Sequence, residues 1–330
     1  MKRFEKILKS KITWSITAFL CVIGILGILF PSQMLDTFRY LPYSYNPFAW
    51  TKNESIPELN KQITSPDFIA QLKTKSMLVK FNLTMNEREK REVIAYLPKG
   101  YDPNDKTKHY PVIYLLHGSP GQDMDWIIEG NAQKTFDNEI DSGKIIPCIA
   151  IFPDGNGGSN NDTQFINSAD GKELNEDFIA KIVVNFVDAN FNTIPDPLHR
   201  AIGGASSGGF GALNIGLKHQ DIFGYILSFS GYWAAEKNPE TQIYIQHSQK
   251  VVDENSPSLY IPHLTDKSVK VFLFSSNVKA PKTDTQRIND LLQNNGFDVH
   301  FISYNGSHSW GFWSKHLFRG LEWLNNLWKG

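Results

Sequence analysis

One serine of this chain has the neighbours of a catalytic nucleophile. Gly204-Ala205-Ser206-Ser207-Gly208 matches G-x-S-x-G, a pattern that exposes the serine hydroxyl on a tight turn when a strand precedes it and a helix follows. The apolar run at 199–203 predicts that strand, and the run at 209–217 predicts that helix. We therefore predict that Ser206 is a nucleophile. The first N–H groups of the helix lack intrahelical acceptors and could stabilise an oxyanion.

A histidine near the C-terminus is the second candidate catalytic residue. Residues 299–304 alternate between apolar and polar, as a strand does, and open into the glycine-containing loop 305–310, which holds His308. An imidazole can take the proton of an attacking serine hydroxyl and return it to the leaving group. Serine first and histidine last, with an acid between them, is one of the orders in which catalytic triads occur. His308 is therefore predicted to be the general base.

The acid of such a triad is predicted to be Asp284. The loop that follows the predicted strand at 269–274 contains no carboxylate before this residue. Thr283 and Gln286 form a T-x-x-Q capping box, which places Asp284 at the first position of a helix. An acid is favoured there by the helix dipole alone, so ordinary capping is the competing interpretation. Two further carboxylates in the same stretch are alternatives: Asp290 and Asp298.

The elements around these residues alternate between strands and helices, which is typical of an α/β fold. Eight segments are predicted to be strands: 77–83, 92–97, 111–116, 148–152, 201–204, 225–230, 269–274 and 299–304. The continuous apolar run at 112–116 is typical of a strand buried on both faces. Residues 177–191 carry one apolar face at helical spacing. Residues 233–264 lie between two strands, and some of their side chains could line an acyl or aryl pocket: Tyr244, Ile245, Tyr260 and Ile261.

Taken together, these motifs resemble the esterase D and antigen 85-like branch of the α/β-hydrolases. That branch includes S-formylglutathione hydrolases, feruloyl esterases, enterochelin esterases and mycolyltransferases. The resemblance runs from about residue 76 to the end of the chain. It is carried by YLPKGY at 96–101, LLHG at 115–118, FPDG at 152–155, AIGGASSGG at 201–209, FG at 223–224, SG at 230–231, GSHSW at 306–310 and Trp313.

The resemblance implies an α/β-hydrolase fold, with a mostly parallel eight-stranded sheet and helices on both faces. It implies that the backbone N–H groups of Ser207 and Ser119 hold the oxyanion, and that three residues contact substrate: His117, Gly118 and Trp310. The family usually has methionine at position 207, but a serine there leaves the N–H unchanged. The loop before Asp284 also departs from the family, because it lacks the usual glycine-led turn to the acid.

Composition limits the other possibilities. The chain has 330 residues, 41% of them hydrophobic, so it can bury a large core. A net charge of −1 without an aromatic-rich basic patch indicates no nucleic-acid partner. Zinc, calcium and redox motifs are missing from the sequence, so neither a metal nor another cofactor is expected. Cys21 and Cys148 lie in separate apolar segments, and no disulfide between them is expected.

The N-terminus predicts attachment to a membrane. Residues 1–11 are basic and the next 19 residues, 12–30, carry no charge, which is long enough to span a bilayer as a helix. The basic flank predicts a cytoplasmic N-terminus, with the linker at 31–70 and the catalytic domain at 71–330 outside. This is a single-pass signal anchor. The alternative is a signal peptide that is cleaved, followed by secretion.

The sequence therefore predicts a serine esterase that hydrolyses a carboxylic ester through an acyl-enzyme outside the cytoplasm. Its substrate is a small-molecule or cell-envelope ester. A second interpretation is an acyltransferase of the mycolyltransferase type, which moves an acyl group to a sugar hydroxyl. A third interpretation is an inactive hydrolase fold that serves as a surface binding module. The triad residues do not distinguish the first two.

Overall fold

The computed structural model describes residues 56–86, 89–157, 162–235, 241–276 and 284–329. The chain divides into two units, Met1–Trp50 and Thr51–Gly330, and all described residues belong to the second. The predicted segments 1–11 and 12–30, and the first part of the linker, lie outside the described residues. Among the helices that are described, none is both long and apolar enough to cross a bilayer.

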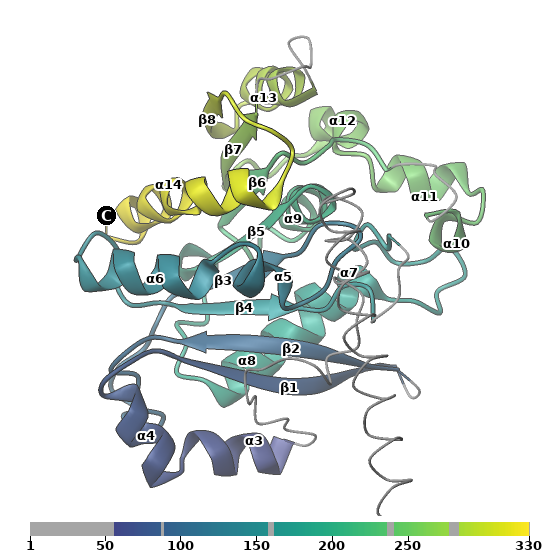
Figure 1. Ribbon diagram of the computed structural model, residues 1–330. Helices are drawn as coiled ribbons and strands as arrows, with labels where there is room; N and C mark the ends of the chain where they lie inside the picture. Colours follow the sequence, from purple (N-terminus) through teal and green to yellow (C-terminus); the bar gives the residue numbers. More distant parts are fainter. Residues whose placement is uncertain (1–55, 87–88, 158–161, 236–240, 277–283, 330) are drawn as a thin grey trace, which may run out of the picture. The chain divides into compact units, whose positions relative to one another are not determined.

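The centre of the fold is a single eight-stranded sheet (Figure 1). Its strands are β1 (Met77–Asn86), β2 (Glu89–Leu97), β3 (Val112–Leu116), β4 (Ile149–Pro153), β5 (Arg200–Ala205), β6 (Tyr225–Phe229), β7 (Lys270–Ser276) and β8 (Asp298–Tyr304). They are ordered β1-β2-β4-β3-β5-β6-β7-β8. β2 runs antiparallel to β1 and β4, and every later neighbour pair is parallel. All eight predicted strands and the mostly parallel sheet are confirmed.

Helices cover both faces of the sheet. The N-terminal helices are α3 (Ile56–Ile63) and α4 (Pro66–Leu72). The helices of the middle of the chain are α5 (Asp125–Ile128), α6 (Ala132–Asp141), α7 (Asn175–Asp177), η2 (Phe178–Val183), α8 (Val184–Asn190), η3 (Pro197–His199) and α9 (Ser207–Lys218). The C-terminal helices are α10 (Gln242–Ile245), α11 (Gln249–Glu254), α12 (Pro257–Tyr260), η4 (Ile261–His263), α13 (Asp284–Asn294) and α14 (Trp310–Trp328). In Figure 1, α6 and α14 lie in front of the sheet and α8 behind it.

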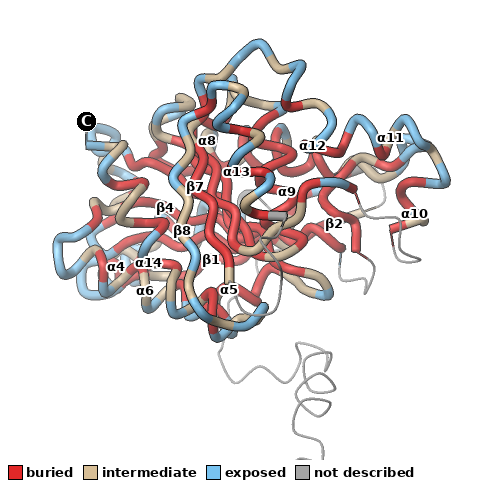
Figure 2. The backbone as a smooth tube through the Cα atoms, turned by 90° about the horizontal axis from the view of Figure 1, so that it is seen from above, coloured by how far each residue is buried: buried red, intermediate tan, exposed pale blue. Residues whose placement is uncertain are grey.

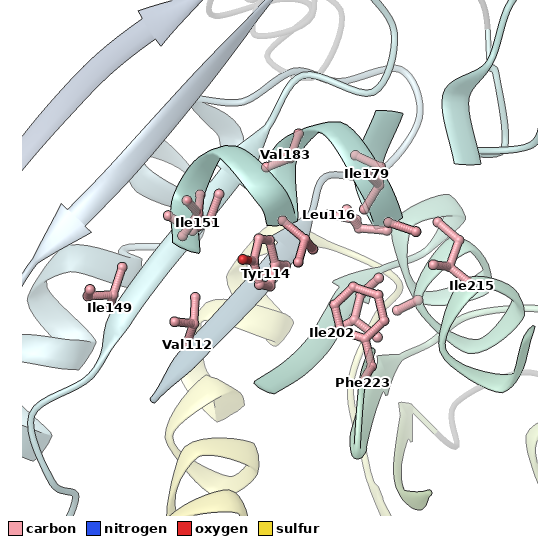
Figure 3. Packing of buried hydrophobic residues seen from close by; sticks show 14 of the residues in the cluster. Val112, Tyr114, Leu116, Ile149, Ile151, Ile179, Val183, Ile202, Ile215 and Phe223 are labelled. Atoms are coloured by element: carbon pink, nitrogen blue, oxygen red, sulfur yellow. The ribbon is translucent and has the colours of Figure 1, made fainter. Parts of the chain in front are cut away.

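The predicted helix at 177–191 forms, with a local change of pitch. It consists of α7, the π-helical turn η2 and α8, which follow one another without a break. Its apolar residues Phe178, Ile179, Val183 and Val187 are buried, as the helical spacing predicted. Figure 3 shows Ile179 and Val183 on the helix beside side chains of the sheet. This helix therefore covers one face of the central strands.

The central strands are buried on both faces, as the apolar runs predicted. Every residue of β3, β4, β5 and β6 is buried. Figure 2 shows these buried segments running through the middle of the domain, with exposed residues on the outer helices and loops. In an open parallel sheet, ligands bind outside the carboxyl ends of the strands. The fold therefore brings the residues after β3, β5, β6 and β8 to one edge.

Candidate active site

Ser206 lies on the sharp turn between β5 and α9. Its backbone is in the left-handed region, with φ 56° and ψ −118°, a strained conformation for a residue with a side chain. A methyl group on Gly204 would clash with the carbonyl group of Gly208, and one on Gly208 would clash with the carbonyl groups of Leu116 and His117. Glycine at both positions is what lets the chain make this turn.

The structure brings His308 to this serine. His308 lies on the loop between β8 and α14, and its Nε2 atom is 2.8 Å from Oγ of Ser206. The residue is exposed, but its ring packs edge-on against Trp313, with 4.9 Å between ring centroids. Trp313 is held in turn by a 3.1 Å hydrogen bond from its indole N–H to Oγ of Ser230. Partial burial of the ring lowers the pKa of His308 and favours the neutral form that can accept a proton.

The third triad member lies at the border of the described residues. Helix α13 begins at Asp284, as the capping pattern predicted, but the side chain of this residue is outside the described set. Among the described residues, Ser206 is the hydrogen-bond partner of the His308 ring, and no carboxylate bonds to it. The assignment of Asp284 as the acid stays a prediction.

Both alternative acids lie in other surroundings. Asp290 is exposed in the middle of α13, where it accepts a 2.6 Å hydrogen bond from the side chain of Gln286. Asp298 begins β8 and pairs with Lys270 at 3.4 Å. Because the histidine loop follows the other end of that strand, about 20 Å of extended chain separates Asp298 from it. Neither position favours a bond to His308.

Two backbone N–H groups next to Ser206 are available for an oxyanion. Ser207 is the first residue of α9, where N–H groups lack intrahelical acceptors. On the other side the 117–121 loop passes close to the serine, because a methyl group on Gly118 would lie 3.6 Å from Cβ of Ser206. Within the described part of the chain, the N–H groups of Ser207 and Ser119 donate to no protein acceptor. The assignment of these two groups to an oxyanion site stays a prediction.

The side chain of Ser207 belongs to a buried polar cluster that the sequence did not predict. Its Oγ donates a 2.7 Å hydrogen bond to Oδ1 of Asp162, and both residues are buried. The hydroxyl of Tyr232 lies 3.4 Å from the same Oγ and 3.1 Å from Oε1 of Gln164. The one sequence signal for this cluster is the serine at a position where the family usually has methionine.

His117 holds the loop rather than facing an open site. The residue is 1% exposed, and both ring nitrogens are within hydrogen-bond distance of backbone groups. Nε2 lies 2.9 Å from the N–H of Gly155, and Nδ1 lies 2.7 Å from the carbonyl oxygen of Gly118. The predicted substrate contact of this ring would require the ring to leave these partners.

Trp310 is half-buried at the start of α14 and belongs to an aromatic cluster. Its ring packs edge-on against Trp126 at 5.1 Å and against Trp313 at 5.2 Å. The indole N–H of Trp126 donates a 2.8 Å hydrogen bond to the carbonyl oxygen of Leu116, at the end of β3. Trp126, which the sequence did not single out, therefore connects this cluster to the strand that leads into the 117–121 loop.

A cavity of about 440 Å³ is lined in part by Tyr232, Trp233, Arg287, Ile288 and Leu291. Ser206 and His308 are not among its lining residues, and Tyr232 connects it to Ser207. The aromatic and aliphatic residues predicted to line a pocket are elsewhere: Tyr244, Ile245 and Ile261 are buried in the core, and the Tyr260 hydroxyl bonds to Asn214. Over the described ranges, no group of three His, Cys, Asp or Glu side chains could hold a metal ion.

Residues 85–324 match the model of a protein family described as "Putative esterase". The chain is 25% identical over 307 residues to an uncharacterized protein of Corynebacterium glutamicum, covering 86% of this chain and 70% of that protein. It is 21% identical over 283 residues to an acetyl esterase of Caldicellulosiruptor saccharolyticus, covering 78% and 98%. An endo-1,4-beta-xylanase/feruloyl esterase of Xylanibacter ruminicola is 35% identical over 159 residues, which are 46% of this chain and 21% of that longer protein.

Solved structures share the same fold. A ferulic acid esterase superposes with a TM-score of 0.66 at 24% identity, over 77% of this chain and 99% of that chain. An S-formylglutathione hydrolase from Staphylococcus aureus superposes with a TM-score of 0.64 at 17% identity, over 77% and 100%. At this level of identity, the likeness concerns the fold.

Proposed function

Because the chain belongs to the Putative esterase family and is a carboxylic ester hydrolase, we propose that it is a serine esterase with Ser206 as nucleophile and His308 as general base. The family match confirms the resemblance that the sequence motifs indicated. The observation that carries the proposed roles is the 2.8 Å distance between Nε2 of His308 and Oγ of Ser206. A nucleophile and its base must lie within such a distance for the proton to be transferred.

The reaction proceeds in two halves. Oγ of Ser206 attacks the ester carbonyl carbon while Nε2 of His308 takes the hydroxyl proton, and a tetrahedral oxyanion forms. Collapse of this intermediate breaks the bond to the alcohol, which leaves with the proton from His308, and an acyl-enzyme remains. Water then attacks the acyl-enzyme while His308 takes its proton. The bond between the acyl carbon and Oγ breaks, Oγ of Ser206 regains the proton from His308, and the carboxylic acid departs. The lowered pKa of His308 supports this role, because the ring must be neutral to begin each half.

The oxyanion is held by the backbone N–H groups of Ser207 and Ser119. Ser207 follows Ser206 directly, and Ser119 follows Gly118, which approaches Ser206 closely; both N–H groups also lack a protein acceptor in the described part of the chain. Donors aimed at the charge that develops in the transition state commonly contribute more than any other single interaction. Asp284 is proposed to orient His308 and to stabilise its protonated form.

The 440 Å³ cavity lined by Tyr232, whose hydroxyl contacts Ser207, is proposed to receive one side of the ester. Its size is within the range of small-molecule pockets, and its walls combine apolar side chains with Tyr232 and Arg287. Two relatives are named for acetyl and feruloyl esters, so these acyl groups are the first substrates to test. The proposed substrate class is therefore a small-molecule or cell-envelope carboxylic ester.

The decisive experiment compares Ser206→Ala with Ser142→Ala, a change at an exposed serine outside the site. Both variants and the wild type are assayed with p-nitrophenyl acetate, p-nitrophenyl butyrate and methyl ferulate, and are labelled with a fluorophosphonate. We expect Ser206→Ala to lose at least about 10³-fold in kcat and all labelling. More than a tenth of wild-type activity in Ser206→Ala would exclude this nucleophile. Adding sugar acceptors tests acyl transfer, because a transferase would form sugar esters instead of free acid.

The catalytic domain is proposed to lie outside the cytoplasm, attached to the membrane by the anchor at 12–30. This proposal rests on the charge pattern of residues 1–30. Protease treatment of intact cells should cut the chain beyond residue 31, and the mature protein should stay with the membrane fraction. A soluble product that begins near residue 31 would instead indicate a cleaved signal peptide.

A further inference from the structure

Arg91 is a buried arginine whose hydrogen bonds lead toward the candidate oxyanion site. It lies on β2, is 1% exposed, and its guanidinium packs over the ring of Phe178 at 5.8 Å. Nε donates to Glu89 at 2.8 Å and Nη2 to Glu173 at 3.2 Å, so the charge is paired on two sides. The remaining fork nitrogen, Nη1, donates to the carbonyl oxygen of Gly155, 64 residues further along the chain.

Gly155 connects this arginine to His117. The N–H of Gly155 can only donate, so Nε2 of His117, 2.9 Å away, must be the unprotonated nitrogen. The proton of the neutral ring is then on Nδ1, which donates to the carbonyl oxygen of Gly118 at 2.7 Å. The two backbone groups thereby determine both the tautomer and the orientation of the imidazole.

The carbonyl group of Gly118, which accepts the hydrogen bond from His117, belongs to the same planar peptide unit as the N–H of Ser119. A peptide plane is rigid, and in a trans unit the C=O and N–H point in opposite directions. Fixing the carbonyl of Gly118 therefore also fixes the direction of the Ser119 N–H. We propose that Arg91, Gly155 and His117 form a buried relay that aims this N–H at the oxyanion, which makes Arg91 a positioning residue for catalysis. The inference rests on the proposed serine-esterase function.

The local packing supports a role in positioning. Thr163 donates a 3.0 Å hydrogen bond to the Gly155 carbonyl that Arg91 also contacts. The ring of Phe165 packs against His117 at 5.2 Å and fills the space where a side chain on Gly155 would lie. Each group of the relay is therefore held from a second side. Burying charged groups costs desolvation energy, but a buried network of this kind can make one conformation of the surrounding chain more specific.

The test compares Arg91→Met and Arg91→Lys with Arg200→Met. Arg200 is the matched control, because it is 5% exposed in the same sheet and pairs with Asp188 but lies at the opposite, amino end of β5. Active sites are counted with the fluorophosphonate, so that kcat is expressed per folded site. Arg91→Met should lower this kcat about 10-fold or more, with KM within about 2-fold of the wild-type value. It should lower the affinity for a boronic acid that forms a tetrahedral adduct with the serine by a similar factor. Arg91→Lys should be intermediate, whereas Arg200→Met should lower only the melting temperature.

A second pair of variants separates the two ends of the His117 ring. His117→Asn keeps a donor near the Gly118 carbonyl, and His117→Gln keeps an acceptor for Gly155 but has no donor close to the main chain. The relay predicts a higher kcat per site for His117→Asn than for His117→Gln. The two His117 variants also test the relay if Arg91→Met fails to fold. Equal values for the two, or a wild-type kcat per site in Arg91→Met, would overturn the proposal.

A readout without turnover distinguishes this inference from the proposed function. In ¹⁵N-histidine-labelled protein, the His117 signals, assigned by their loss in His117→Asn, should show the Nδ1–H tautomer. They should shift in Arg91→Lys and not in Arg200→Met. If the wild type is neither active nor labelled by the fluorophosphonate, the proposed function fails, and the NMR result alone decides the relay. An Nε2–H tautomer, or signals that Arg91→Lys leaves unchanged, would refute it.

Discussion

Nε2 of His308 lies 2.8 Å from Oγ of Ser206, although 102 residues separate the two in the sequence. The pair meets because β5 and β8 belong to the parallel part of one sheet, where the carboxyl ends of the strands share an edge. The ring of His308 packs perpendicular to the ring of Trp313, although the residue as a whole is exposed.

The packing of Trp313 on His308 predicts a specific pH profile. Burial lowers the pKa of His308, and the base must be neutral, so kcat/KM should fall as pH decreases through a value below the ordinary histidine pKa of about 6.5. Trp313→Ala should remove much of this burial and move the acidic limb of the profile upward, toward the ordinary histidine value. The measurement is kcat/KM against pH for both proteins, because this profile reports the pKa of the free enzyme. An unchanged limb in the variant would show that Trp313 does not set the pKa.

Asp284→Asn tests the orienting acid. If Asp284 stabilises the protonated form of His308, kcat should fall by roughly 10²- to 10⁴-fold, with the melting temperature nearly unchanged. If it is only a capping residue, activity should stay within a few-fold, and stability should change by about 1 kcal/mol or less. Asp290→Asn and Asp298→Asn are the controls, and both should keep wild-type activity. Loss of activity in either control would transfer the role to that residue.

Gly204→Ala should disrupt the turn that holds Ser206. The added methyl group would meet the backbone of Gly208 and Leu116, neither of which can move aside as a flexible side chain could. We expect a loss of about 1–3 kcal/mol in stability and a large decrease in fluorophosphonate labelling per folded molecule. Gly311→Ala is the control: it lies in α14 with open space around its Cβ, and it should stabilise the fold by up to about 1 kcal/mol. Normal labelling of Gly204→Ala would show that the turn at Ser206 does not require glycine at position 204.

Ser207→Ala separates the backbone of this residue from its side chain. The variant keeps the N–H proposed for the oxyanion but leaves the buried Asp162 without the 2.7 Å hydrogen bond from Oγ. We expect kcat to stay within a few-fold and the free energy of unfolding to fall by about 1–3 kcal/mol, measured by urea denaturation. If turnover instead fell by about a hundredfold or more in a stable variant, the side chain, rather than the backbone N–H, would act in the reaction.

Local features of the sequence were enough to predict the strands, the turn at Ser206 and the start of α13. Apolar runs predicted the central strands β3 to β6, because a strand buried on both faces in a parallel sheet must be apolar nearly throughout, whereas alternation of apolar and polar residues predicted β8. The G-x-S-x-G pattern predicted the turn at Ser206, because both glycines lie where no side chain fits. The capping box predicted the start of α13 at Asp284 for a similarly local reason.

Tertiary structure alone decided which distant residues meet. The Asp162 carboxylate that bonds Ser207 and the Arg91 side chain that reaches Gly155 come from segments without a recognisable motif. Their roles depend on which loops the order of the strands places side by side. That order cannot be predicted from local sequence periodicity. The ring of His117 shows the same limit: the motif identified the residue, but only the burial of both its nitrogens against backbone groups showed that it holds the loop.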